Sequence, residues 1–225
     1  KNELIRPAVA NVEQALVVMS AKDPDFSAVL VDRICFLIEL AGITPVLLIT
    51  KMDLVGEEDS LYDIIEDYRK SGIKVVLKSK DSKPELIGEL LKGKISVLTG
   101  QSGVGKTSLI NSLDPSFQLH TQKISKALGR GKHTTRHTQL HFVLGGWIAD
   151  TPGFSSLDFS KVDKKELANT ILDFKPYIGK CRFRDCMHVN EPNCAVKEAV
   201  EQGEVSKIRY KKYIDVLKTI KEVKY

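Results

Sequence analysis

Short apolar runs alternate with amphipathic segments through the first 160 residues. Four of these runs have the length and the Val, Ile and Leu content of buried strands: 15–19, 45–49, 75–77 and 95–98. The amphipathic stretches between them end at Gly42, Gly72 and Gly93, as helices commonly do. Ser82-Lys-Pro-Glu85 has the pattern of a capping box for the third helix. The alternation predicts an α/β fold, with a parallel sheet, helices on both faces and ligands at the carboxyl ends of the strands.

The pattern changes after Asp173. Residues 175–193 have little periodicity, and two helical segments follow, at 195–202 and at about 205–224. We therefore predict two domains, an α/β domain at 1–173 and a smaller helical domain at 174–225.

A phosphate-binding loop follows the fourth apolar run. Gly100-Gln-Ser-Gly-Val-Gly-Lys-Thr107 matches GxxxxGK[ST], in which successive backbone N–H groups converge on phosphate oxygens at a helix N-terminus. Lys106 would place its charge on the β- and γ-phosphates, and the Thr107 hydroxyl would ligate Mg²⁺. The residues expected to bind the nucleotide here are Gly100, Gln101, Ser102, Gly103, Val104, Gly105, Lys106, Thr107 and Ser108.

A second phosphate motif lies some forty residues later. Asp150 ends a strand-like segment and begins Asp-Thr-Pro-Gly153, which matches DxxG. In GTPases the Asp of this motif acts on the Mg²⁺ shell and the Gly N–H contacts the γ-phosphate. We expect these roles for Asp150 and Gly153.

Guanine recognition usually needs [NT]KxD after a strand, and the chain offers two candidates. Ser160-Lys-Val-Asp163 follows the phosphate motifs but has no apolar run before it, so we interpret Asp163 as a helix cap. Thr50-Lys51-Met-Asp53 closes the run 45–49, where a base reader should lie. The motif order is then base reader, phosphate loop, DxxG. This order is a circular permutation of the usual P-loop GTPase.

Two details of the base-reading end follow from this order. Ser79 comes directly after the run 75–77, so its backbone N–H could contact the guanine oxygen, although Lys78-Ser-Lys80 could also be a plain surface turn. Thr50 stands where Asn is commoner and lacks an amide. We expect the loss of one bracing or base-edge hydrogen bond, at a cost of ~1 kcal/mol.

Three cysteines and one histidine cluster in the second predicted domain: Cys181, Cys186, His188 and Cys194. Three thiolates and one imidazole complete a tetrahedral Zn²⁺ site with no open position, so we expect a structural zinc ion. Such a cluster also indicates a reducing compartment. Cys35 stands alone in an apolar helical stretch and is expected in the core.

The net charge of +5 is concentrated at the C-terminal end. Residues 175–225 contain 12 Lys or Arg and 7 Asp or Glu, so the rest of the chain is balanced. This excess favours an anionic partner, nucleic acid before membrane, although a solvated Lys-rich helix is the alternative. No apolar run reaches the ~20 residues of a membrane span, and no signal-peptide core is present, so we expect a cytoplasmic protein.

The motifs together resemble the RsgA/YjeQ family of ribosome-small-subunit-dependent GTPases. The resemblance rests on Arg6-Pro-Ala-Val-Ala-Asn-Val-Glu-Gln14, the permuted base reader, the phosphate loop, Gly129-Arg-Gly-Lys-His-Thr-Thr-Arg136 and the Cys/His cluster. It implies GTP hydrolysis coupled to late maturation of the small ribosomal subunit, with that subunit and its rRNA as partners. Family members begin with an OB-fold domain, and the present sequence resembles the part that follows it.

The catalytic group is expected in the basic, glycine-punctuated segment 120–141. Thr134 or Thr135 should supply a second Mg²⁺ ligand, and the resemblance favours Thr135. Phe154 follows DxxG where Ras-type enzymes have the water-positioning Gln, and the resemblance assigns that task to His133. A phosphate-facing or solvent-exposed His133 is the alternative.

Two other functions compete with an assembly GTPase. One is a guanine-nucleotide sensor that binds GTP or ppGpp with incidental turnover. The other is a zinc-dependent RNA-binding module with a decayed nucleotide site, which the two intact phosphate motifs disfavour. We expect a monomer that does not associate with membranes.

Overall fold

The computed structural model describes residues 11–113, 140–150 and 157–220. All four predicted apolar runs form strands. The elements in chain order are β1 (Gln14–Ser20), α1 (Ala28–Leu40), β2 (Thr44–Thr50), η1 (Met52–Leu54), α2 (Leu61–Lys70), β3 (Lys74–Leu77), α3 (Glu85–Leu91), β4 (Ile95–Thr99), α4 (Lys106–Leu113), β5 (Leu140–Val143), β6 (Gly146–Asp150), α6 (Lys164–Thr170), η3 (Leu172–Tyr177), α7 (Ala195–Gln202) and α8 (Lys207–Thr219).

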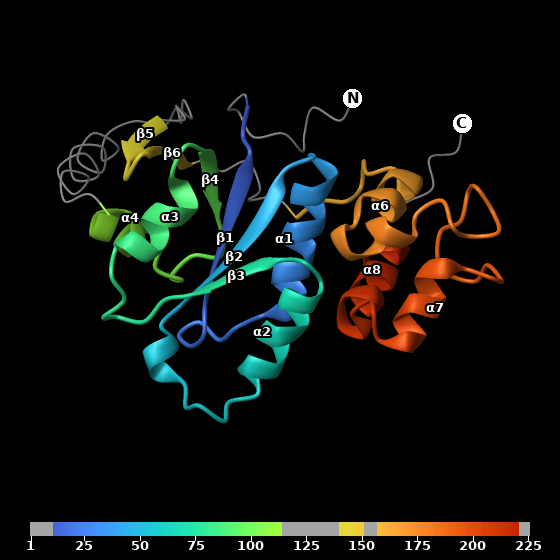
Figure 1. The fold of residues 1–225 in the computed structure, drawn as a ribbon, viewed down its shortest axis with the longest axis horizontal. Coiled ribbons are helices and arrows are strands. Elements are labelled where there is room, and N and C mark those ends of the chain that lie inside the picture. Colours follow the sequence, from blue (N-terminus) through green and yellow to red (C-terminus); the bar gives the residue numbers. More distant parts are fainter. Residues whose placement is uncertain (1–10, 114–139, 151–156, 221–225) are drawn as a thin grey trace.

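The strands form one sheet in the order β3-β2-β1-β4-β6-β5 (Figure 1). All neighbours are parallel except β5, which pairs antiparallel with β6. The central strand β1 is buried along its whole length, because helices cover both of its faces. Parallel pairing brings the carboxyl ends of β1, β2, β3 and β4 to one edge, and the predicted base reader and phosphate loop both begin there.

Alternate residues of β1 enter two different apolar cores. Ala15, Val17 and Met19 pack on the side of α1 and α2, whereas Leu16 and Val18 pack on the side of α3 and α4. This alternation is the period-2 pattern of a strand with both faces covered. Cys35 of α1 is fully buried in the first of these cores, as the sequence predicted.

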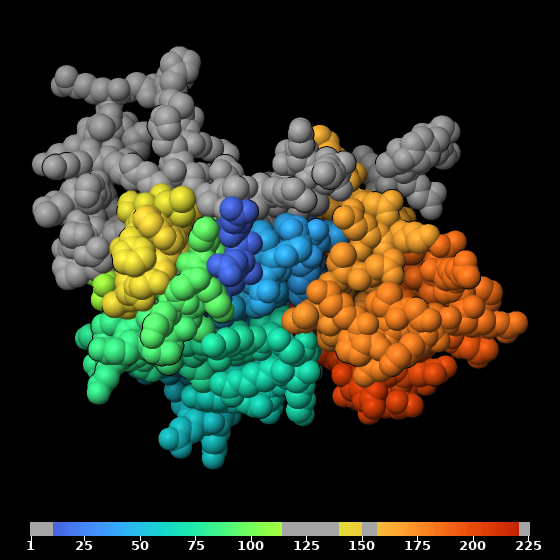
Figure 2. All heavy atoms as spheres, turned by 45° about the horizontal axis from the view of Figure 1, so that its top comes forward, coloured from blue at the N-terminus to red at the C-terminus, as the bar shows by residue number. Residues whose placement is uncertain are grey.

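Residues 164–220 form a C-terminal lobe that packs against α1 through α6 and α8. Figure 2 shows this lobe, coloured orange to red, beside the sheet and its helices. Its apolar side chains, among them Phe174, Val196 and Tyr213, belong to the same core as α1. The core therefore continues across residue 173, and the division into two domains there stays a prediction.

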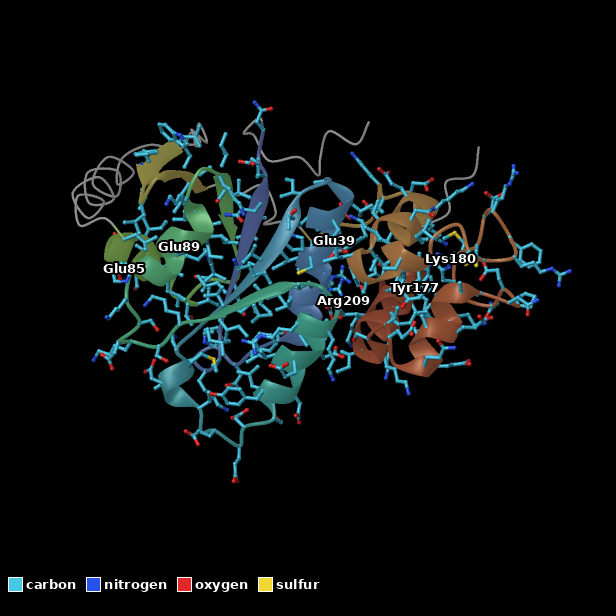
Figure 3. The ribbon with its side chains drawn as sticks, in the orientation of Figure 1. Glu39, Glu85, Glu89, Tyr177, Lys180 and Arg209 are labelled. Atoms are coloured by element: carbon cyan, nitrogen blue, oxygen red, sulfur yellow. The ribbon has the colours of Figure 1, made fainter. Side chains whose placement is uncertain are left out.

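One buried arginine joins the C-terminal lobe to the sheet domain. Arg209 of α8 is fully buried and donates to Asp32 at 3.2 Å, Glu39 at 3.1 Å and Asp173 at 3.1 Å. Its guanidinium carbon also lies 5.2 Å from the centre of the Phe36 ring. Glu39 on α1 and Arg209 on α8 are labelled where the two helices meet in Figure 3. We call these four charged residues the Arg209 cluster.

Two local predictions can be compared with the helix ends. Asp163 caps α6, because its Oδ1 accepts a hydrogen bond from the Glu166 N–H at 2.8 Å. This confirms its interpretation as a cap rather than a base reader. The capping box at Ser82 is wrong: α3 begins after Pro84 without a side-chain cap, and Ser82 Oγ accepts from the Ser79 N–H instead.

Candidate nucleotide site and metal centre

The phosphate loop connects β4 to α4 and requires glycine for steric reasons. Gly100 has φ +141°, and a Cβ built there would lie 2.0 Å from the Val18 carbonyl oxygen. Gly103 and Gly105 also have positive φ, a backbone conformation that glycine adopts without steric cost. Lys106 lies over this loop and donates to the Gly100 and Gln101 carbonyls, both at 2.7 Å. The loop thus has the strand, turn and helix context that the motif requires.

Thr50 braces the phosphate loop from the end of β2. Its side chain is buried, and its hydroxyl lies 2.7 Å from the Val104 carbonyl oxygen and 3.2 Å from that of Met19. We expected Thr in place of Asn to lose one bracing or base-edge hydrogen bond. The hydroxyl does make a bracing hydrogen bond to Val104, and a loss relative to Asn stays a prediction.

Asp53 faces the loop after β3. Its Oδ1 accepts a hydrogen bond from the Lys80 N–H at 2.9 Å. The Ser79 N–H, which the sequence suggested for guanine, donates to Ser82 Oγ at 2.9 Å. The backbone donor that contacts Asp53 is therefore that of Lys80, one residue later, and the contact of the Ser79 N–H with guanine stays a prediction. Spacing alone could not distinguish two adjacent N–H groups, since their directions depend on the turn.

These loops enclose a cavity of about 370 Å³, a size typical of small-molecule sites. Its lining residues are Thr50, Lys51, Asp53, Leu54, Lys78, Ser79, Lys80, Val104, Gly105, Ser108 and Leu109. The base reader and the phosphate loop therefore line the same cavity, although about fifty residues separate them in the chain. Of the phosphate-loop residues outside this lining, Gln101, Ser102, Gly103 and Thr107 are exposed, and Gly100 and Lys106 are partly buried.

The second phosphate motif is described only in part. The backbone of Asp150 ends β6 and pairs in register with Leu98 of β4, two residues before the phosphate loop. His133, Thr134, Thr135 and Gly153 lie outside the described residues.

The Cys/His cluster converges in the C-terminal lobe. One ligand atom from each of Cys181, Cys186, His188 and Cys194 lies within 4.8 Å of the others. Cys181 Sγ is 3.9 Å from Cys194 Sγ and 3.6 Å from His188 Nδ1, which is 3.3 Å from Cys194 Sγ. Around a tetrahedral zinc ion, neighbouring S and N ligand atoms lie roughly 3.5–3.8 Å apart. The geometry and the soft donor set therefore fit a metal ion of this kind.

The loop that carries His188 is held from two sides. The Glu191 carboxylate accepts hydrogen bonds from the N–H groups of Met187 at 2.7 Å, Val189 at 2.8 Å and Asn190 at 3.1 Å. Burial acts to raise the pKa of Glu191, but these hydrogen bonds outweigh it and lower the pKa. From α8, Tyr210 donates to the His188 carbonyl at 2.7 Å. Nothing in the sequence singles out Glu191, which resembles any other surface acid.

Comparisons with known proteins agree with this geometry. The model of the RsgA GTPase family matches residues 1–160. A relative from Geobacillus thermodenitrificans, named small ribosomal subunit biogenesis GTPase RsgA, is 48% identical over 229 residues, which cover 100% of this chain and 78% of the relative.

The chain belongs to the RsgA GTPase family.

Other RsgA relatives support the same placement. A Bacillus subtilis protein of the same name is 47% identical over 229 residues, which cover 99% of this chain and 76% of that protein. The crystal structure of YloQ, described as a circularly permuted GTPase, superposes with a TM-score of 0.80 at 41% identity, covering 100% of this chain and 74% of that one. The crystal structure of YjeQ from Thermotoga maritima superposes with a TM-score of 0.79 at 37% identity, covering 96% of this chain and 74% of that one. The permuted α/β GTPase fold predicted from the motif order is confirmed.

Membership in the RsgA family identifies the chain as a GTPase. No helix within the described ranges is long and apolar enough to cross a membrane.

Proposed function

We propose that this chain binds and hydrolyses GTP as a step in the late maturation of the small ribosomal subunit. The observation that carries the proposal is the cavity that Asp53 of the base reader shares with Gly105 and Ser108 of the phosphate loop. The relatives that match the whole chain are named for GTPase activity and small-subunit biogenesis, which supports the same function.

Guanine selection is assigned to Asp53 and to the backbone of Lys80. A carboxylate accepts two hydrogen bonds from the N–H groups on the guanine edge, which adenine does not present. The Lys80 N–H lies beside that carboxylate and would donate to the guanine carbonyl oxygen once the base occupies the cavity. Thr50 and Lys51 brace the two loops around the base, and Ser79 shapes the turn that carries Lys80.

The phosphates are assigned to the loop 100–105 and the first turn of α4. The N–H groups of the loop and the Lys106 ammonium would bind the phosphate oxygens, with the Thr107 hydroxyl, Thr134 or Thr135, and Asp150 directed to Mg²⁺. Mg²⁺ supplies positive charge at the β- and γ-phosphates when it is bound. The Gly153 N–H would contact the γ-phosphate.

His133 is assigned to position the attacking water. Phe154 has no polar group for this task, and the basic segment that carries His133 lies between the two phosphate motifs in the chain. A group that acts only in the transition state should affect turnover far more than nucleotide binding. We infer that docking on RNA brings His133 to the attacking water and accelerates hydrolysis.

We assign two roles to the C-terminal lobe, holding a structural metal ion and contacting RNA. A closed site of three thiolates and one imidazole suits a structural Zn²⁺ ion, since no position remains for a substrate. Arg182 and Arg184 are exposed beside it and could contact rRNA phosphates. We place the protein in the cytoplasm, where the small subunit matures, and expect it to act as a monomer.

Turnover with and without small ribosomal subunits tests the proposal. GTP hydrolysis by the purified chain should be slow alone and should accelerate on addition of small subunits, and ATP should not replace GTP. Lys106→Ala is the control, because it should lose both binding and turnover. Nucleotide binding without any acceleration would favour a guanine-nucleotide sensor instead.

A further inference from the structure

The loop between β1 and α1, residues 21–27, lies behind the loops that line the nucleotide cavity and belongs to none of the GTPase motifs. The Ala21 N–H donates to the Thr50 carbonyl at 2.9 Å and ties the start of this loop to the end of β2. Further along, Pro24 Cδ lies 3.7 Å from the position that a Cβ on Gly103 would occupy. The β1–α1 loop therefore contacts both the base-reading loop and the phosphate loop.

Lys51 connects the same three segments through its ammonium group. Lys51 Nζ donates to the Asp23 carbonyl of the β1–α1 loop and lies 3.4 Å from the Gly103 carbonyl of the phosphate loop. Two carbonyl oxygens thus hold one cation beside the cavity that Lys51 lines. Because the ammonium is held, the alkyl stem of Lys51 has a fixed place in the cavity wall.

The two residues in this contact have unfavourable backbone conformations. Lys51 has φ +57° and Asp23 has φ +51°, a left-handed region that side-chain-bearing residues adopt rarely. Such conformations persist only where the surroundings impose them, and they occur most often at functional sites. The β1–α1 loop must therefore contain a contact that holds Asp23 in place.

Ser20 supplies that contact. It is the last residue of β1, is 1% exposed, and donates through Oγ to the Pro24 carbonyl at 2.6 Å. This hydrogen bond closes the chain around Asp23 and anchors its carbonyl to the rigid end of the central strand. Without the hydroxyl, the loop would keep its ends but lose the internal bond that sets the direction of the Asp23 carbonyl.

We propose that Ser20 is a positioning residue for guanine-nucleotide binding: through the β1–α1 loop it fixes the Asp23 carbonyl, which with Gly103 holds Lys51 in the cavity wall. The proposal rests on the function proposed above and adds a residue that does not touch the nucleotide. Because Lys51 lies at the base end of the site, Ser20 acts equally on GTP and GDP. Uniform binding of this kind changes KM and not kcat.

Ser20→Ala should weaken binding of fluorescent GTP and GDP analogues by ~2- to 12-fold, the range for one lost hydrogen bond. KM for GTP should rise by a similar factor, and kcat at saturation should change less than twofold. The matched control is Ser27→Ala in the same loop, whose hydroxyl caps α1 by accepting from Leu30 N–H at 3.3 Å. Ser27→Ala should leave nucleotide affinity within twofold of the wild type.

A double mutant separates positioning from a general loss of stability. If Ser20 acts through Lys51, Ser20→Ala should cost no further affinity in a Lys51→Ala background. Additive losses there, or wild-type affinity in Ser20→Ala alone, would overturn the inference. A wild-type chain that binds no guanine nucleotide would instead refute the proposed function, so the two failures are distinguishable.

Discussion

Replacing Arg209 with methionine should destabilise the protein strongly, and more at high pH than at low pH. With its three acids ionised, the Arg209 cluster has a charge of −2, which becomes −3 without the guanidinium. All four side chains are at most 3% exposed, so water cannot compensate the loss. Breaking a buried ion pair by removing one partner typically costs about 3–5 kcal/mol, and we expect that range at pH 8.

The pH dependence follows from the acids of the cluster. Burial raises the pKa of Asp32 to about 6 and that of Glu39 to about 7, against the lowering effect of Arg209. Raised pKa values mean that the folded state binds more protons than the unfolded state between about pH 4 and 7, so stability falls as pH rises. Without Arg209 the cluster should bind at least one more proton. Each additional bound proton lowers the penalty by about 1.4 kcal/mol per pH unit as the pH falls. Between pH 8 and pH 5.5 the penalty should therefore shrink to about 0–1.5 kcal/mol.

Urea unfolding at pH 5.5 and pH 8 measures both effects. Fluorescence of Trp147, the only tryptophan of the chain, reports on the sheet. Far-ultraviolet circular dichroism reports on the helices of the sheet domain and of the C-terminal lobe. The control is Lys212→Met on the same helix, whose half-exposed contact with Asp215 should contribute less than ~0.5 kcal/mol. A penalty for Arg209→Met below 1 kcal/mol at pH 8, or an equal penalty at both pH values, would refute the reasoning.

Three further changes test other parts of the structure. Gly100→Ala should abolish nucleotide binding in a filter or fluorescence assay, because its Cβ would meet the Val18 carbonyl, whereas Gly56→Ala, with open space around it, should not. Asp53→Asn should shift preference from guanine to xanthine nucleotides in competition experiments, and retained GTP preference would remove Asp53 as the base reader. Glu191→Gln should lower zinc affinity ~10- to 100-fold in a chelator competition, with the exposed Glu198→Gln as control and an unchanged affinity as the contrary result.

The sequence predicted the features that depend on local pattern. Four apolar runs became strands, and the absence of an apolar run before Ser160 correctly excluded Asp163 as base reader. The position of a motif after a strand was sufficient to place it in the site, because the carboxyl ends of parallel strands lie at one edge of the sheet. The order of the motifs along the chain was then enough to imply the permuted topology.

Details that depend on turn geometry could not be predicted in the same way. Ser82 matched a helix cap, but its hydroxyl is engaged by the Ser79 N–H, which leaves Lys80 as the donor beside Asp53. The burial of Arg209 does have a signal in the sequence. It shares one face of α8 with Tyr213, Val216 and Leu217, all buried, and a charge on an apolar stripe indicates a buried partner.

The Arg209 cluster also constrains the order in which the chain can fold during synthesis. Asp32 and Glu39 precede Arg209 by 177 and 170 residues. At 5–20 residues per second, a ribosome needs roughly 10–30 s to synthesise the chain between these acids and Arg209. Until then α1 carries two acids that have no counter-ion. The face of α1 that later meets α8 therefore cannot be buried. A helix made late therefore completes the packing of one made early.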